Sequence, residues 1–136
     1  MKTYKRVLSI AGSDSSGGAG VQADLKAISA CGCFAMTAIT AVTAQNTLGV
    51  RAIEPLPVNV IEAQIRACLN DIGVYAVKIG MLHSVEVIQA VTRVLADYPI
   101  KHIVVDPVMV ATSGDLLLQQ EAIACLLYTS DAADDR

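Results

Sequence analysis

Segments of two kinds alternate along this chain, and the alternation limits the folds open to it more than any single motif does. Short apolar or β-branched runs predict strands over residues 6–11, 37–44, 74–79 and 102–105. Between them, apolar residues recur at helical spacing over residues 20–30, 57–71 and 84–98. Strands and helices in this alternation form parallel units, with helices packed on both faces of one sheet. The predicted fold class is therefore α/β, a three-layer αβα sandwich around a parallel sheet.

The ends of the predicted strands indicate where a ligand would bind, because parallel sheets hold ligands beyond the carboxyl ends of their strands. These ends are Gly12, residues 44–46, residues 80–81 and residues 106–107. A turn over residues 46–49 and a short extra strand over residues 50–53 are predicted after the second of them.

Composition excludes several classes of protein. The 136 residues are 54% hydrophobic and 17% charged, which is too apolar for a disordered chain. The net charge is −3 and no Lys/Arg cluster is present, so the sequence offers no footprint for nucleic acid. The longest apolar stretch covers residues 33–44, whereas a membrane span needs about 20 apolar residues. We expect a cytoplasmic protein with no nucleic-acid and no membrane partner.

A glycine-rich loop, residues 12–20, joins the first predicted strand to the first predicted helix. Gly12 and Gly17 fit the two glycines of a P-loop, but Gly18 and Ala19 stand where that motif needs Lys and Ser/Thr. Without the lysine charge a triphosphate would not be neutralised, so a P-loop is rejected. The remaining interpretations are a loop whose backbone approaches a ligand at a helix N-terminus, or a tight connection with no ligand.

The same loop also matches a dinucleotide-binding fingerprint over residues 18–23. That fingerprint requires an acid at the end of the next strand for the ribose hydroxyls, and after Asp24 the first acid is Glu54. A nicotinamide-dependent dehydrogenase is thus disfavoured. Asp24 itself lies near the helix N-terminus, where a carboxylate can accept hydrogen bonds from a ligand hydroxyl or amine. The alternative is a solvated surface carboxylate.

Four motifs carry a resemblance to one family. They are Ile10 to Lys26 (IAGSDSSGGAGVQADLK), Thr37 to Asn46 (TAITAVTAQN), Val77 to Met81 (VKIGM) and Val105 to Met109 (VDPVM). In this order they resemble the signatures of hydroxymethylpyrimidine/phosphomethylpyrimidine kinases, enzymes of thiamine biosynthesis with a ribokinase-like fold. The resemblance covers residues 5–125.

This resemblance implies an activity and a set of site residues. Family members use ATP and Mg²⁺ to phosphorylate 4-amino-5-hydroxymethyl-2-methylpyrimidine and then its monophosphate. Gln45 would pair its amide with the pyrimidine amino group and ring nitrogen. Asp106 would lie near the phosphates and Mg²⁺, which a lone carboxylate suits. The residues that would line the pyrimidine pocket are Gly12, Ala19, Asp24, Thr43, Met81 and Val108. Of these, Thr43 stands where the family often has an apolar residue.

The resemblance stops after Cys125. Residues 126–136 form an acidic tail without a family match, which we interpret as a truncation scar or foreign read-through. Residues 1–125 would be the N-terminal portion of a kinase domain that is incomplete at its C-terminus. The family's Gly-Thr-Gly-Cys anion hole, its catalytic base and most of its ATP site would then lie downstream, so we expect no kinase activity from this chain alone.

Other interpretations stay open at this point. One is a pyridoxal/pyridoxine kinase of the same superfamily, and another is a pyrimidine-binding module without catalysis. The expected partners are the small-molecule pyrimidine and ATP, and a homodimer is compatible with the resemblance.

Overall fold

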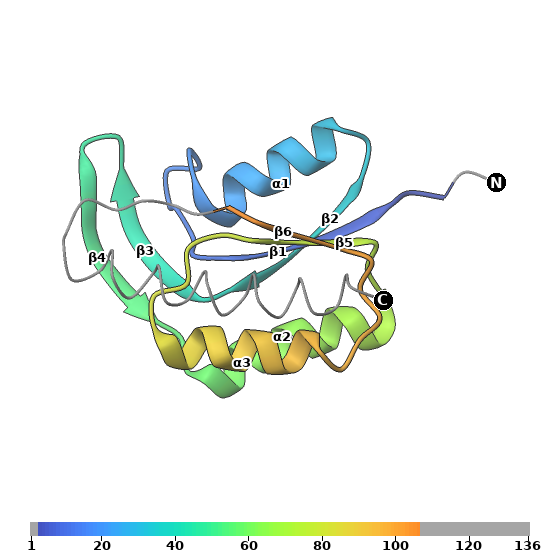
Figure 1. Ribbon diagram of the computed structural model, residues 1–136. Coiled ribbons are helices and arrows are strands. Elements are labelled where there is room, and N and C mark those ends of the chain that lie inside the picture. Colours follow the sequence, from blue (N-terminus) through green and yellow to red (C-terminus); the bar gives the residue numbers. More distant parts are fainter. Residues whose placement is uncertain (1–2, 107–136) are drawn as a thin grey trace.

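The main sheet has four parallel strands with helices on both faces. In the computed structural model, which describes residues 3–106, the strand order is β2-β1-β5-β6. The strands are β1 (Arg6–Ala11), β2 (Phe34–Ile39), β5 (Ala76–Ile79) and β6 (His102–Val105). Helix α1 (Gly20–Ala30) lies on one face, and α2 (Val58–Asp71) and α3 (Val85–Leu95) lie on the other (Figure 1). The predicted αβα sandwich is therefore confirmed, while Val108 and residues 126–136 fall outside the described residues.

A separate two-stranded sheet corrects one prediction. The expected single strand over residues 37–44 is wrong, because the chain leaves the main sheet at Thr40. The Thr40 N–H donates to the Ala11 carbonyl in the main sheet (3.0 Å), whereas the Thr40 carbonyl accepts from the Leu56 N–H (3.0 Å). The following residues form an antiparallel hairpin, β3 (Ala41–Asn46) and β4 (Gly49–Pro55), which projects from the sheet in Figure 1. The extra strand expected at residues 50–53 is confirmed as part of β4.

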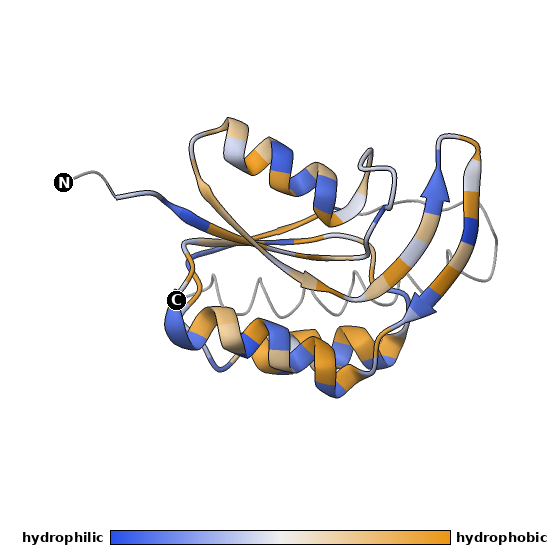
Figure 2. Cartoon of the chain, turned by 180° about the vertical axis from the view of Figure 1, so that it is seen from behind, coloured by the Kyte–Doolittle hydropathy of each residue, from blue (hydrophilic) through white to orange (hydrophobic). Residues whose placement is uncertain are grey.

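The hydrophobic core lies between the sheet and the α2/α3 layer. Aliphatic side chains at most 2% exposed fill it, namely Leu8, Ile10, Ala38, Val77 and Ile79 from the sheet and Ile61, Ile65, Val87, Ile88, Val91 and Val94 from the helices. Figure 2 shows hydrophobic bands along α2 and α3. Pro57 precedes α2, and Ser84 caps α3 as predicted, its Oγ accepting from the Val87 N–H (3.2 Å). Within residues 3–106, no helix is long and apolar enough to cross a membrane.

Candidate functional site

The glycine-rich loop is organised around the carboxylate of Asp14. This carboxylate accepts hydrogen bonds from the Ser16 N–H (2.9 Å), the Ser16 hydroxyl (2.7 Å) and the Gly18 N–H (3.0 Å). These bonds, the one from the Ser16 hydroxyl foremost, lower the pKa of Asp14 below its ordinary value. Two N–H groups and one hydroxyl group of the loop thus point towards its own carboxylate. Sequence analysis did not single out Asp14, although an Asp before Ser-Ser-Gly is typical of such side-chain-closed turns.

Gly20 is the position where this loop most needs a glycine. Its φ is +60°, and a Cβ there would lie 2.3 Å from the Gly12 carbonyl oxygen. The same carbonyl accepts a hydrogen bond from the Val21 N–H (2.9 Å), which joins the end of β1 to the first turn of α1. Any side chain at residue 20 would push these two segments apart.

Hydrogen bonds from the loop hold strand β3 in place. The Ser13 hydroxyl accepts from the Thr43 N–H (3.0 Å), and the Thr43 hydroxyl donates to the Ser13 carbonyl (2.7 Å). Two residues further along the loop, the Ser15 hydroxyl accepts from the Gln45 N–H (2.7 Å) and donates to the Gln45 carbonyl (2.6 Å). These contacts bring Thr43 and Gln45, two residues predicted from sequence, beside the loop that contains Gly12 and Ala19.

The Gln45 side chain is half-buried at the point where the hairpin register shifts between Ala44 and Gln45. Its Oε1 lies 3.3 Å from the Thr43 hydroxyl, while its Nε2 donates no hydrogen bond within residues 3–106. A carboxamide whose backbone is fixed and whose nitrogen is free can pair with a polar ring edge.

A charged cluster lies between helix α1 and the sheet. The Asp24 carboxylate Oδ2 accepts from the Ser9 hydroxyl (2.6 Å) and from the Lys78 ammonium (2.8 Å). Asp24 is therefore not the free surface acid that was one alternative. The Lys78 Nζ also lies 3.9 Å from Asp106 Oδ2, at the end of β6. Sequence analysis missed Lys78 and Ser9; their signal was a polar residue inside an otherwise apolar strand.

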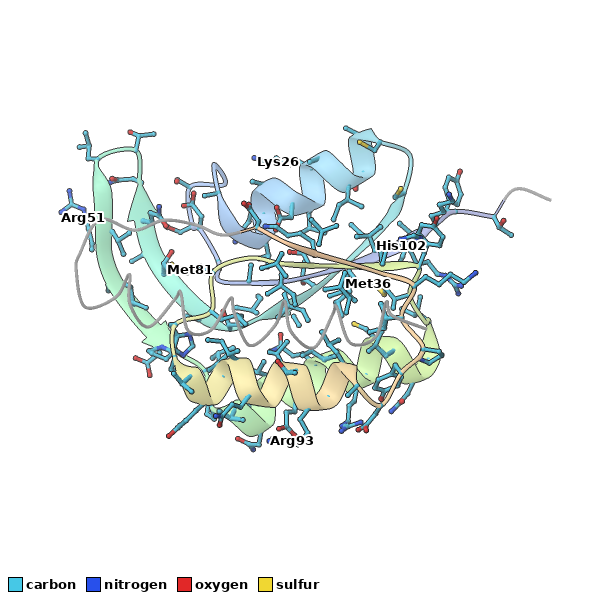
Figure 3. All side chains as sticks on the ribbon, viewed as in Figure 1. Lys26, Met36, Arg51, Met81, Arg93 and His102 are labelled. Atoms are coloured by element: carbon cyan, nitrogen blue, oxygen red, sulfur yellow. The ribbon has the colours of Figure 1, made fainter. Side chains whose placement is uncertain are left out.

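Two predicted residues follow the carboxyl ends of β5 and β6. Met81 is 39% exposed and lies at the same end of the sheet as the hairpin (Figure 3). The Asp106 side chain is 59% exposed, and its N–H donates to the Ile79 carbonyl (2.9 Å). Within residues 3–106 no group of three or more His, Cys, Asp or Glu could hold a metal by itself. A single carboxylate still fits Mg²⁺, which keeps several waters and takes its other ligands from substrate phosphates.

Comparisons with known proteins show the family of this chain. The family model described as phosphomethylpyrimidine kinase matches residues 14–129. The hydroxymethylpyrimidine/phosphomethylpyrimidine kinase of Haemophilus influenzae is 53% identical over 126 residues, which are 93% of this chain and 47% of that protein.

The chain belongs to the phosphomethylpyrimidine kinase family. Its α/β fold is accordingly ribokinase-like, and the resemblance seen in the four motifs is confirmed.

Solved structures place this phosphomethylpyrimidine kinase family member among two groups of enzymes. The crystal structure of phosphomethylpyrimidine kinase from Clostridium difficile has a TM-score of 0.80 and 53% identity, over 90% of this chain and 53% of that one. A Staphylococcus aureus pyridoxal kinase in complex with AMP-PCP and pyridoxal has a TM-score of 0.79 and 37% identity, over 93% of this chain and 45% of that one. The chain spans about half the length of the relatives it matches.

Proposed function

We propose that this chain forms the acceptor-substrate half of a hydroxymethylpyrimidine/phosphomethylpyrimidine kinase of thiamine biosynthesis. The observation that carries the proposal is the attachment of Gln45 to the glycine-rich loop through both of its backbone polar groups. This attachment presents one carboxamide beside a loop of small residues, and its N–H₂ group donates no hydrogen bond within residues 3–106. An aminopyrimidine edge carries a donor and an acceptor, and a carboxamide complements both.

The other pocket residues have roles that follow from their positions. Gly12 and Ala19 would let the backbone approach the flat ring, and Met81 would pack on it with a polarisable side chain. Thr43 would orient the Gln45 amide oxygen, since the two groups lie 3.3 Å apart. Val108 would complete the lining, as the resemblance implies, and stays a prediction outside the described residues.

Asp24 and Asp106 would act on the side where phosphoryl transfer takes place. Asp24 would accept a hydrogen bond from the substrate, and Asp106 would hold a hydrated Mg²⁺ that neutralises phosphate charge when ATP binds. ATP use is supported by the S. aureus pyridoxal kinase, which was solved with an ATP analogue. We further propose that residues 1–125 are the N-terminal portion of the kinase domain and residues 126–136 a tail, although the family match extends past this boundary to residue 129.

A pyridoxal or pyridoxine kinase is the second candidate, favoured by the shared fold of the S. aureus enzyme. Its 37% identity is well below the 53% identity of the C. difficile phosphomethylpyrimidine kinase, so the pyrimidine alcohol is the preferred substrate. The pyrimidine-binding module without catalysis describes what we expect of the 136 residues alone. A homodimer and a cytoplasmic location stay predictions.

Isothermal titration of the purified chain with hydroxymethylpyrimidine, and separately with pyridoxal, tests the proposal. We expect tighter binding of the pyrimidine, and about tenfold weaker binding for Gln45→Ala because that variant loses hydrogen bonds to the ring. The matched control is Gln89→Ala on the exposed side of α3, which should bind like the wild type.

Tighter binding of pyridoxal would favour the second candidate, a pyridoxal or pyridoxine kinase. If the chain bound neither alcohol, both proposed functions would be rejected.

An enzyme assay adds to this test. A chimera that joins residues 1–125 to the C-terminal half of the H. influenzae relative should phosphorylate the pyrimidine, and the 136-residue chain alone should not.

A further inference from the structure

Lys78 occupies a position in the sheet that is costly for a charged side chain. It lies in the interior strand β5, between Val77 and Ile79, which are both 0% exposed. Side chains alternate across a strand, so Lys78 faces α1 while its two neighbours face the aliphatic core. A partly buried ammonium group requires a partner that offsets its loss of hydration.

Lys78 and a residue of the neighbouring strand donate hydrogen bonds to the same oxygen atom. Ser9 of β1 is the register neighbour of Lys78, and both side chains donate to Oδ2 of Asp24. The side chains of Lys78 and Asp24 are 23% and 19% exposed. Oδ2 is engaged twice, whereas Oδ1 accepts no side-chain hydrogen bond within residues 3–106. The strands thus fix the direction of a carboxylate that the helix supplies.

Gly80 leaves the space that this ammonium group needs. A Cβ at Gly80 would lie 3.2 Å from Lys78 Nζ and 2.8 Å from the Ala11 Cβ. Even a methyl group at this strand end would therefore press on the ammonium group. The absence of a side chain at Gly80 therefore leaves room for the Lys78 ammonium group at the carboxyl end of β5.

Asp106 brings a second carboxylate near the same ammonium group. Its Oδ2 lies 3.9 Å from Nζ, against 2.8 Å for Asp24. One positive charge therefore has two carboxylates within 4 Å. Without Lys78, neither carboxylate would have this positive neighbour at the end of the sheet where we propose that a phosphate-bearing substrate approaches. Their negative charges, above all that of the largely buried Asp24, would then repel the phosphate.

We propose that Lys78 is a positioning residue of the pocket, which orients Asp24 and balances the negative charges of Asp24 and Asp106. The pocket then accepts an anionic monophosphate as well as the neutral alcohol. The inference rests on the proposed function and deepens it. It assigns the binding of both substrates, the alcohol and the monophosphate, to the charge of one side chain that acts through Asp24.

The test compares two dissociation constants for each variant of the 136-residue chain, measured by isothermal titration. The ligands are hydroxymethylpyrimidine, which is neutral, and its monophosphate. For Lys78→Met we expect monophosphate binding to weaken about tenfold more than alcohol binding, because the variant removes a charge. Lys78→Gln keeps a donor towards Asp24 and should show the same selective loss, whereas Lys78→Arg should keep the wild-type ratio.

The matched control is Arg66→Met, which removes an ion pair of equal length, 2.8 Å to Asp97, between α2 and the turn after α3. Both dissociation constants should stay at their wild-type values in this variant. An equal loss for the two ligands in Lys78→Met, or no loss, would overturn the inference and leave the proposed function intact. Wild-type chain that binds neither ligand would instead overturn the proposed function.

Circular dichroism separates a binding defect from a folding defect. If Lys78→Met does not fold, Lys78→Gln carries the comparison. Failure of both neutral variants to fold would also count against the inference, since it would show that Lys78 serves the stability of the sheet.

Discussion

The two faces of the main sheet differ sharply, although the same strands build both. On the α2/α3 side, Leu8 and Ile10 of β1 are 0% exposed and belong to one aliphatic core. On the α1 side, Ser9 lies between them in sequence and is equally buried, yet it donates to a carboxylate. Strand β5 repeats the contrast with Lys78 between two core residues. Adjacent residues of one strand therefore contribute to stability on one face and to the candidate site on the other.

The helices show the same difference. Helix α3 has six buried residues and α2 has three, whereas α1 has only Val21. Helix α1 is instead attached through the Asp24 ion pair and through the backbone of the glycine-rich loop. A polar attachment gives less stabilisation than aliphatic burial, but it holds a charged group in a defined direction. We expect substitutions on the two faces to have different consequences.

The largest effect on stability should come from the aliphatic face. Ile10→Ala removes a fully buried side chain and should lower the free energy of unfolding by about 2–5 kcal/mol. Urea denaturation measures this loss. The control is Ile53→Ala on β4, whose side chain is 56% exposed, and it should cost less than about 0.5 kcal/mol. Equal losses for the two variants would contradict the assignment of the core.

A second comparison uses two glycines with positive φ at the two ends of α1. Gly20→Ala places a Cβ 2.3 Å from the Gly12 carbonyl, so it should cost about 3 kcal/mol and weaken binding of the pyrimidine. Gly32→Ala has a φ of +80° but nothing within 4 Å of its Cβ. It should cost only the conformational strain, about 1 kcal/mol, and leave binding unchanged. Similar binding by the two variants would mean that the loop does not form a pocket wall.

On the polar face, Ser9→Ala should have a smaller effect on stability than Ile10→Ala, the next residue along β1. The variant removes one hydrogen bond to Asp24 while Lys78 keeps its own, so we expect a loss of about 1.5 kcal/mol. Urea denaturation of both variants side by side gives the ratio. A loss as large as that of Ile10→Ala would show that the two faces contribute alike.

The smallest expected effect is a pH dependence that originates in the loop. The pKa of Asp14 is lowered in the folded chain, mainly by the Ser16 hydroxyl, so its stabilising contribution is complete above its ordinary value of 3.8. The contribution disappears as the pH falls through the lower, folded-state pKa. Thermal denaturation should find Asp14→Asn less stable than the wild type at pH 7, with the gap narrowing below about pH 4. A gap that is constant down to pH 2 would contradict the hydrogen-bond network.

Local patterns in the sequence were sufficient for most elements of the fold. Helical spacing and the Ser84 cap located α3, and β-branched runs located the strands of the main sheet. The exception is the run over residues 37–44, which is continuous in composition but divides at Thr40. Its two halves form their hydrogen bonds with different neighbours, namely β1 for one and β4 for the other. Strand propensity depends on such neighbours and cannot reveal the division.

For the site, the sequence by itself determined the family, the glycine-rich loop and the strand ends where a ligand is expected to bind. Gly12, Ala19, Thr43 and Gln45 were proposed from motifs, and their ligand roles stay predictions. Only the tertiary structure decided how Asp24 is used, because its partners Ser9 and Lys78 are distant in sequence and meet it across the α1 face of the sheet. The sequence shows where apolar and polar residues alternate along a strand. Which charged residues form pairs depends on which strands and helices become neighbours in the fold.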